Sequence, residues 1–233
     1  MTTKTTGTIE ATPPTQPPPM EDPLRLLPRI LTKLYSIWLS LTYPFASVGR
    51  NFSIHYTCDI SRLKAHRIKL GNSVLIMKDT LIEAVAPPKQ NGEPVVVIDD
   101  NVGIGPSCQI SAKNLVHLER DTIVAQGSLI ADNSCGFGNG RLPDCEHGTS
   151  EGGRIRIGRG CWIGSGVAIV CTHGELVLGR NCVVAANAVV TSSSPAHSVI
   201  IGNPGRVIRR FDPEQNAWVI GSGRSTQTPE RSK

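Results

Sequence analysis

Aliphatic side chains recur at every sixth position through the middle of the chain, in groups of three. All members are Ile, Leu or Val, and the twelve positions are Ile98, Ile104, Ile110, Leu118, Val124, Ile130, Ile157, Ile163, Ile169, Leu178, Val184 and Val190. An α-helix repeats every 3.6 residues and a strand every two, so neither produces a period of six. A short fixed period is typical of a solenoid, in which each turn packs on the next.

Two further columns follow the same period. Three residues after the first two members of each group stand residues that tolerate a left-handed backbone: Asn101, Ser107, Asp121, Gly127, Gly160, Gly166, Asn181 and Asn187. The next column is small or slender: Val102, Cys108, Thr122, Ser128, Cys161, Val167, Cys182 and Ala188. The first column indicates a sharp corner and the second a narrow interior.

The pattern predicts an all-β fold, a parallel β-helix of hexapeptide repeats with three short faces to a turn. Equivalent positions lie 20 residues apart at Ile98 and Leu118 and 21 apart at Ile157 and Leu178, which is three hexads plus a small corner insertion. Weaker hexads precede them at Val48, Ile54, Ile60, Leu70, Ile76 and Ile82. The repeat does not fix the hand of the coil, and crossover connections are generally right-handed.

The rest of the chain divides around this repeat. We expect a disordered tail rich in Thr and Pro at residues 1–22, an amphipathic helix at 23–47 and the β-helix at 48–211. An inserted loop at 133–154 interrupts the β-helix, and a second tail follows at 212–233.

The amino-terminal helix is predicted from apolar residues at spacings of three and four: Leu24, Leu27, Leu31, Leu34, Trp38 and Leu41. One interpretation is an interfacial helix that contacts a membrane through residues 24–45. The other is a helix packed on its own domain or on a neighbouring subunit, and we favour this second interpretation.

Composition narrows the function classes. Aromatic residues make up 4% of the chain, which disfavours an immunoglobulin-like sandwich and a base-stacking surface for nucleic acid. Seven cysteines without a Cys-x-x-Cys pair favour a reducing compartment, and no apolar run is long enough to cross a membrane. We therefore expect a cytoplasmic protein, and the first interpretation of the helix would hold it at the inner face of the membrane.

Charge is unevenly distributed along the chain. Residues 90–151 carry three basic and nine acidic side chains, whereas residues 152–211 carry seven arginines and one glutamate. If the segments stack in sequence order, one end of the molecule is electropositive and attracts an anionic cofactor.

Several stretches resemble the hexapeptide-repeat (LpxA-like) acyltransferases, with the sugar and xenobiotic O-acetyltransferases as the nearest branch. They are Ile157–Ser165, Leu178–Gly179, Val183–Thr191, Ser194–Ala196 and Ile201–Arg210, and the resemblance covers roughly residues 48–211. It implies a left-handed β-helix, a homotrimer with active sites between subunits, and acyl transfer from acetyl-coenzyme A to a hydroxyl.

The resemblance also implies roles for individual residues. Ser165, Ala186, Thr191 and Arg209 stand where family members contact coenzyme A, and Arg206 is a helper. Small alanines leave room for the slender pantetheine arm, Thr191 can hydrogen-bond an amide, and arginines suit phosphate groups.

The acceptor side of the motif is altered. The family uses a histidine in the long loop as general base, and the corresponding stretch Ile130–Phe137 has none. Three explanations stay open: His147 supplies the base, Cys135 takes part as a thiolate, or the reaction has been lost. Asn133 and Trp162 are the candidates for contact with the acceptor.

A zinc-dependent anhydrase on this fold requires three histidines around one metal, and the six histidines here show no paired ligand spacing. We thus expect no metal and no nucleic-acid partner. The sequence predicts an acyl-coenzyme A-dependent O-acyltransferase that acts on a sugar or related small-molecule or glycan acceptor, with surface-polysaccharide building blocks as a natural class. The alternative is a catalytically silent trimer that binds coenzyme or organises partners.

Overall fold

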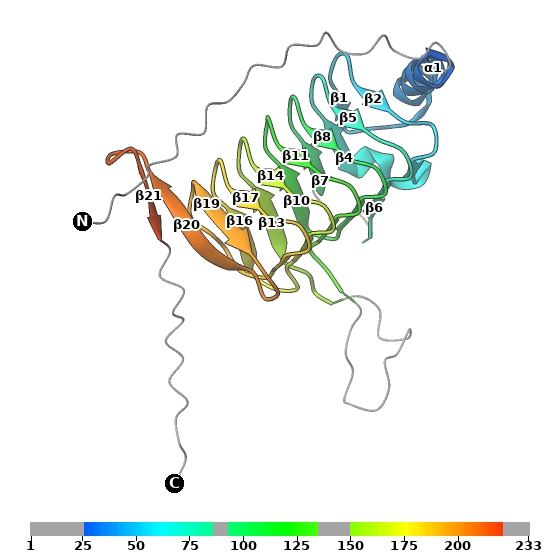
Figure 1. Ribbon diagram of the computed structural model, residues 1–233. Coiled ribbons are helices and arrows are strands. Elements are labelled where there is room, and N and C mark those ends of the chain that lie inside the picture. The colour runs from blue at the N-terminus through cyan, green and yellow to red at the C-terminus, as the bar shows by residue number, and fades with distance from the viewer. Residues whose placement is uncertain (1–25, 86–92, 135–149, 221–233) are drawn as a thin grey trace, which may run out of the picture.

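The computed structural model describes residues 26–85, 93–134 and 150–220, and the chain forms a three-sided parallel β-helix (Figure 1). The predicted tail at 1–22, residues 221–233 and most of the inserted loop lie outside the described residues. The coil is left-handed, as the resemblance implies and against the general preference of crossover connections.

Three sheets form the faces, and the chain visits them in the order A, B, C on every turn. Sheet A contains β1 (Ser47–Val48), β4 (Ile68–Leu70), β7 (Val96–Ile98), β10 (Leu115–Leu118), β13 (Arg154–Ile157) and β16 (Glu175–Leu178). Sheet B contains β2 (Ser53–Ile54), β5 (Leu75–Ile76), β8 (Gly103–Ile104), β11 (Ile123–Val124), β14 (Trp162–Ile163), β17 (Val183–Val184), β19 (Ser198–Ile201), β20 (Arg206–Asp212) and β21 (Ala217–Ile220). Sheet C contains β3 (Asp59–Ile60), β6 (Leu81–Ala84), β9 (Gln109–Ala112), β12 (Leu129–Ala131), β15 (Ala168–Val170) and β18 (Val189–Val190).

The predicted aliphatic column forms the core. All twelve side chains are at most 2% exposed, and they stack in register from turn to turn. In sheet B, for example, Ile104 pairs with Val124, Val124 with Ile163, and Ile163 with Val184. The six-residue pattern thus marks the buried position at the centre of each face.

The predicted corners are confirmed as well. All eight residues of the corner column have a positive φ, between 55° and 70°. Every member of the small column that follows is buried. The chain turns sharply after sheet A and after sheet B, and the small side chain then enters a narrow interior.

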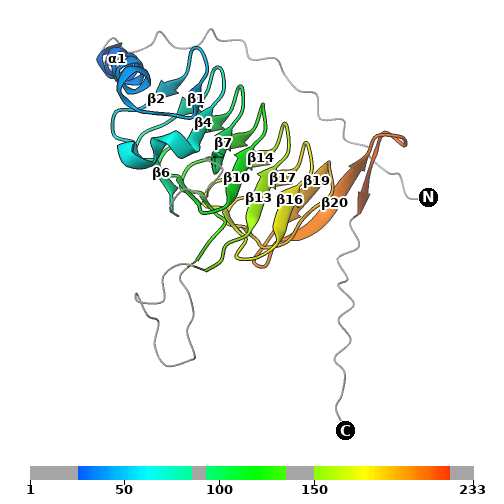
Figure 2. The same cartoon turned by 180° about the vertical axis from the view of Figure 1, so that it is seen from behind.

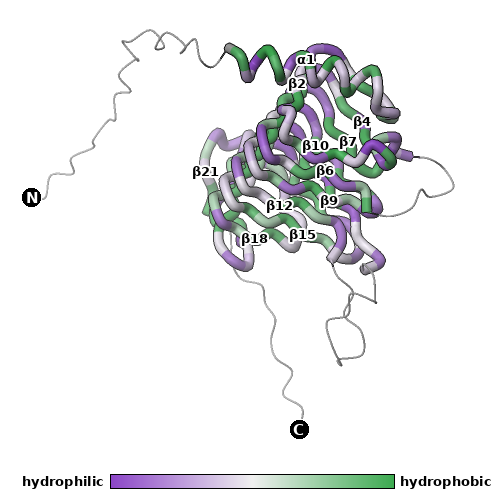
Figure 3. Tube along the Cα trace, turned by 90° about the vertical axis from the view of Figure 1, so that its right-hand side faces the viewer, coloured by the Kyte–Doolittle hydropathy of each residue, from purple (hydrophilic) through white to green (hydrophobic). Residues whose placement is uncertain are grey.

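The two ends of the coil are covered by different elements (Figure 2). At one end helix α1 (Leu26–Thr42) lies against β2, where the Ser36 hydroxyl accepts a hydrogen bond of 2.9 Å from the Ile54 N–H. A short 3₁₀ helix, η2 (Arg62–Arg67), lies close to β4 and β6. Figure 3 shows the strands of sheet C side by side and α1 at the end of the coil next to β2.

At the other end, β20 and β21 form an antiparallel hairpin on β19. The Phe211 and Trp218 rings pack edge to face across it, with centroids 5.4 Å apart. The sequence pattern assigned residues 212–233 to a tail, because a lone hairpin carries no six-residue repeat. Strand β21 lies in this segment. None of the helices in the described part of the chain is long and apolar enough to span a membrane.

Candidate functional site

A groove of about 530 Å³ runs along the edge where sheet B turns into sheet C, here called the B–C edge. Its lining includes Lys78, Pro106, Gln126, Ser165 and Ala186. These residues come from successive turns, because each follows the central residue of its sheet B strand by two positions. The repeat therefore places residues far apart in the sequence in one vertical column.

Ser165 and Ala186, two of the predicted coenzyme residues, lie side by side in this groove. The turns are close here: a Cβ added at Gly164 would lie 2.7 Å from the Ala186 nitrogen, so only glycine fits at that position. The Asn187 N–H donates to the Ser165 carbonyl over 2.9 Å. Ser165 is partly exposed and Ala186 is exposed, which leaves an open channel beside a rigid backbone.

The other predicted coenzyme residues lie near the carboxyl-terminal end but do not line this groove. Thr191 is exposed and directly follows β18, at the far side of sheet C. Arg206 begins β20, next to Gly205, whose N–H donates to the Val189 carbonyl over 2.7 Å. Arg209 pairs with Val199 and Ile220. A ligand that reaches from Ala186 to Thr191 spans at most about 18 Å, the extended length of the chain between them.

Trp162 belongs to an apolar stripe on the outer face of sheet B. It is 58% exposed and pairs with Ile123, which is 55% exposed. Leu75, two turns from Ile123 on the same face, is 48% exposed. Large apolar side chains aligned on one face are typical of a surface that another molecule covers.

The base of the inserted loop is a buried polar cluster at the edge between sheets C and A. The fully buried Asp132 carboxylate accepts hydrogen bonds of 2.6–2.7 Å from the backbone N–H groups of Lys113, Asn114 and Leu115. The Asn133 amide donates to Ser111 and to Asp132, so its N–H groups are engaged inside the fold.

The same cluster closes the loop at its base. The Gly153 N–H donates to the Asp132 carbonyl, and the Ser150 N–H donates to the Ser134 carbonyl over 2.8 Å. The Lys113 ammonium group donates to the Ser150 carbonyl. The two candidate bases, Cys135 and His147, lie outside the described residues, between these two anchors.

Sequence reasoning missed Asp132 and its buried neighbour Arg67. Burial lowers the pKa of the Arg67 guanidinium, and the negative charge of Asp132 acts in the opposite direction. One feature of the sequence could have pointed to Asp132: it is an acidic residue directly after the aliphatic pair Ile130–Ala131, at the point where the six-residue period breaks.

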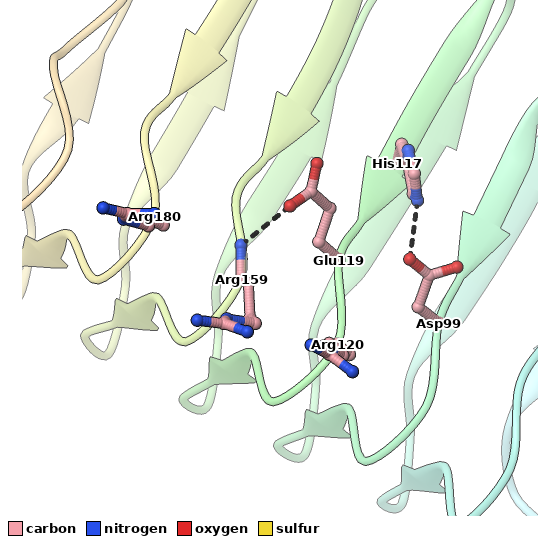
Figure 4. Close-up of a pocket in the computed structure, with 6 residues that line it drawn as sticks. All are labelled: Asp99, His117, Glu119, Arg120, Arg159 and Arg180. Atoms are coloured by element: carbon pink, nitrogen blue, oxygen red, sulfur yellow. Dashed lines mark hydrogen bonds and ion pairs between the residues drawn. The ribbon is translucent and has the colours of Figure 1, made fainter.

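Arginines gather at a second site, along the edge between sheets A and B. Arg120, Arg159 and Arg180 come from successive turns and line a pocket of about 410 Å³ (Figure 4). The backbone N–H of Arg159 donates to the Glu119 carboxylate over 3.0 Å. The arginine-rich segment is thus divided between this edge and strand β20, and only part of its charge lies near Arg206 and Arg209.

The same pocket contains a histidine and carboxylate pair. His117 Nε2 lies 3.0 Å from Asp99 Oδ2. His117 belongs to β10. It faces a different edge from the Ser165 groove. Among the described residues, no group of three or more His, Cys, Asp or Glu side chains is placed to hold a metal ion.

Comparisons with known proteins find acetyltransferases. The chain is 28% identical over 134 residues to WbbJ of Escherichia coli, named as a lipopolysaccharide biosynthesis O-acetyl transferase, covering 54% of this chain and 66% of WbbJ. It is 30% identical over 118 residues to the acetyltransferase SAR2635 of Staphylococcus aureus, covering 49% and 57% of the two chains. It is 26% identical over 178 residues to the acetyltransferase Rv3034c of Mycobacterium tuberculosis, covering 76% and 53%.

The chain thus spans about half to two thirds of the length of these relatives. No family model matches the sequence. Among solved structures, a single-site mutant of AntD, an N-acyltransferase from Bacillus cereus in complex with dTDP and coenzyme A, superimposes with a TM-score of 0.62. The identity is 16%, and the match covers 77% of this chain and 90% of AntD, which shows a shared fold.

Proposed function

Because this chain belongs to the hexapeptide-repeat family of left-handed β-helix acetyltransferases, we propose that it transfers an acetyl or short acyl group from acyl-coenzyme A to a hydroxyl of a sugar or related acceptor. The observation that carries the proposal is the open groove beside Ser165 and Ala186, two of the residues that match the family's coenzyme-binding motif. The relatives named as acetyltransferases support it.

In this proposal the acyl donor lies along the carboxyl-terminal turns. Its slender arm passes Ser165 and Ala186, where small side chains leave room. Thr191 hydrogen-bonds an amide of the arm, and Arg206 and Arg209, both exposed, meet the phosphates. The ligand is extended, which agrees with the spread of these residues over the molecule.

The reaction needs a base for the acceptor hydroxyl. As the hydroxyl oxygen attacks the thioester carbonyl, the base removes the hydroxyl proton, and the coenzyme leaves as a thiol once it is protonated. His147 is our first candidate for the base and Cys135 the second, both in the inserted loop. Asn133 and the cluster around Asp132 hold the base of that loop, and Trp162 borders the acceptor.

We propose a homotrimer with the active site between subunits. On one protomer the groove lies at the B–C edge, whereas the inserted loop leaves from the opposite side of sheet C. A loop from one subunit therefore completes the groove of the next. The exposed stripe Leu75, Ile123 and Trp162 supplies an apolar surface for the contact.

The acceptor class is drawn from the relatives. WbbJ is named for lipopolysaccharide biosynthesis, and AntD is an N-acyltransferase solved with dTDP-4-amino-4,6-dideoxyglucose in two of its mutant structures. We propose a glycan building block used in surface-polysaccharide synthesis, handled in the cytoplasm or at the inner face of the membrane. The alternative is a catalytically silent trimer that keeps the donor groove, since the family's histidine is missing from Ile130–Phe137.

Calorimetric titration of acetyl-coenzyme A tests the donor side. We expect micromolar to millimolar binding by the unmodified protein and a loss of about tenfold or more in Arg209→Ala, because a charged hydrogen bond to phosphate is removed. Arg210→Ala is the matched control, because neighbouring residues of a strand point to opposite faces. The absence of binding by the unmodified protein would sink both the enzyme and the scaffold proposals.

Thiol release with a panel of sugar acceptors then separates enzyme from scaffold. We expect turnover by the unmodified protein and a loss of about a hundredfold or more in His147→Ala, with coenzyme binding retained. The same loss in Cys135→Ala instead assigns the base to the thiol. Full activity in both variants removes both candidates, and coenzyme binding without any thiol release favours the silent trimer.

A further inference from the structure

Helix α1 presents its apolar side to solvent and its more polar side to the β-helix. Ser36 and Leu39 are the buried residues on the side that meets β2. Seven large apolar side chains point the other way and are 44–80% exposed: Leu27, Ile30, Leu31, Leu34, Ile37, Trp38 and Leu41. At 100° per residue they occupy an arc of about 120°, which we call the outer face of α1.

This orientation reverses the expected one. A helix that packs on its own domain normally turns its apolar stripe towards the core. Here the stripe predicted from the sequence is the exposed one, and the helix is held in place by the Ser36 hydrogen bond to Ile54 and by the buried Leu39. The outer face is therefore free to contact another apolar phase.

The charges on the helix and beside its end are mostly basic. Helix α1 contains Arg29 and Lys33 and no acidic residue. Both basic residues lie outside the outer face, beside β2 and β5, and the Lys33 ammonium group donates to Asn51 over 3.3 Å. The neighbouring η2 carries Leu63, which is 86% exposed and follows Arg62. The Arg62 Nε donates to the Thr42 carbonyl over 3.1 Å, which joins η2 to the end of α1. Apolar side chains flanked by basic ones thus gather at one end of the molecule.

Aromatic side chains border the same surface. The half-exposed Trp38 stacks on Tyr35, with centroids 5.6 Å apart, and packs edge to face against Tyr43 at 5.7 Å. Tryptophan and tyrosine are enriched at the level of lipid headgroups, because their rings are amphipathic. At 17 residues α1 is about 25 Å long, which suits a helix that lies in the surface rather than one that crosses it.

We propose that the outer face of α1 docks on a membrane surface that contains anionic lipids. The helix lies in the interfacial plane and its apolar side chains enter the acyl boundary. Lys33, near the edge of the outer face, and Arg62, beside the end of the helix, meet the lipid phosphates. A second copy of the chain is a poorer occupant in a face-to-face contact, because two such faces bring basic residues against basic residues. The proposal does not depend on acyl transfer.

Vesicle flotation of the full chain tests this directly. We expect the protein to float with vesicles that contain phosphatidylglycerol, much less with phosphatidylcholine alone, and less in high salt. The double variant Leu34→Gln with Trp38→Gln should bind anionic vesicles about tenfold more weakly or worse, because two apolar anchors are lost without a change in charge. Both side chains are exposed, so the fold is expected to persist.

Ser40→Gln is the matched control, an exposed position on α1 outside the outer face, and should float like the unmodified protein. Sedimentation without vesicles is measured in parallel. The proposal is overturned if the unmodified protein stays with the unbound fraction, if the double variant floats equally well, or if the double variant dissociates an oligomer that otherwise forms. The last result would assign the outer face to a second copy. Coenzyme binding, measured separately, is unaffected by any of these outcomes.

Discussion

At the scale of single residues, the fold depends on side chains that fit a corner and on those that follow it into the interior. Asn101, with φ at 60°, accepts the left-handed backbone, and its amide donates to Asp121 one turn on over 3.3 Å. Cys108, which follows the corner residue Ser107, is buried, and its thiol donates to the Ala125 carbonyl over 3.1 Å. Both columns were readable from the sequence, because each position has one dominant requirement.

Burial of Cys108 predicts a pH dependence of stability. Desolvation raises the pKa of this thiol above its ordinary value of 9.0, and backbone hydrogen bonds oppose the shift only in part. The folded state therefore favours the protonated thiol. The contribution of the Cys108 thiol to the free energy of unfolding is fully present below pH 9. It is lost as the pH rises from 9 towards the folded-state pKa, because the thiol of the unfolded chain ionises first.

We expect the free energy of unfolding to fall above pH 9, with Cys108 contributing at most about 1.4 kcal/mol per pH unit. Urea unfolding at pH 8 and pH 10 measures this change, and in Cys108→Ala the fall should be smaller. Ser128→Ala, at the equivalent position one turn on, removes no thiol and should show the same fall as the unmodified protein. An equal fall in all three proteins would contradict the assignment to Cys108.

At the scale of elements, the inserted loop depends on one carboxylate. Asp132 accepts hydrogen bonds from three consecutive backbone N–H groups at the corner between β9 and β10, and its own carbonyl accepts from Gly153 at the far end of the loop. Asp132→Asn replaces one carboxylate oxygen by an NH₂ group, which cannot accept a hydrogen bond from these backbone donors. We expect a loss of about 1–3 kcal/mol in the free energy of unfolding, measured by urea titration.

The same variant should separate the two halves of the proposed reaction. Thiol release should fall by about tenfold or more, because the loop that carries His147 loses its anchor. Affinity for acetyl-coenzyme A should stay within about twofold, since Asp132 is not part of the groove. Ser111→Ala, which removes only one acceptor of Asn133, is the milder control. A parallel loss of coenzyme affinity would show that Asp132 supports the whole fold rather than the loop.

The elements also show where sequence reasoning stops. Periodicity predicted the strands, the corners and the core, because the same six-residue requirement repeats on every turn. It could not predict the orientation of α1, since an amphipathic pattern tells which side is apolar but not which side meets the domain. It also missed Asp132 and did not separate the arginines at the edge between sheets A and B from Arg206 and Arg209. Those features depend on which edge a residue occupies, and residues such as Arg159 and Arg206 differ in this respect although they share a segment.

At the scale of the whole molecule, the position of the loop and the groove on different sides of sheet C predicts complementation between subunits. His147→Ala and Arg209→Ala should each be strongly impaired alone when the coenzyme is subsaturating. If each site takes the loop from one subunit and the coenzyme-binding residues from the next, a mixed trimer regains about a third of the activity, because one of its sites joins two intact halves. Co-expression with two affinity tags, followed by thiol release on the doubly tagged fraction, measures the recovery.

Mixed trimers without recovered activity would place both residues in one protomer, and a trimeric mass by sedimentation is the accompanying control. Recovery above that of either variant would also locate the site between subunits without knowledge of the acceptor. The sequence resemblance implied such a site, and the separation of loop and groove on a single chain gives a reason why one protomer would be insufficient.

The two elements that cover the ends of the coil have a consequence for solubility. Each turn offers the next a full row of backbone donors and acceptors, and nothing in the repeat itself limits the number of turns. At the first parallel strand of sheet B, the Ser36 hydroxyl accepts a hydrogen bond from the Ile54 N–H. At the last one, β19, the antiparallel hairpin takes up the free edge. Without them, bare prisms would stack end upon end into filaments of indefinite length, so these covers keep the protein a discrete particle.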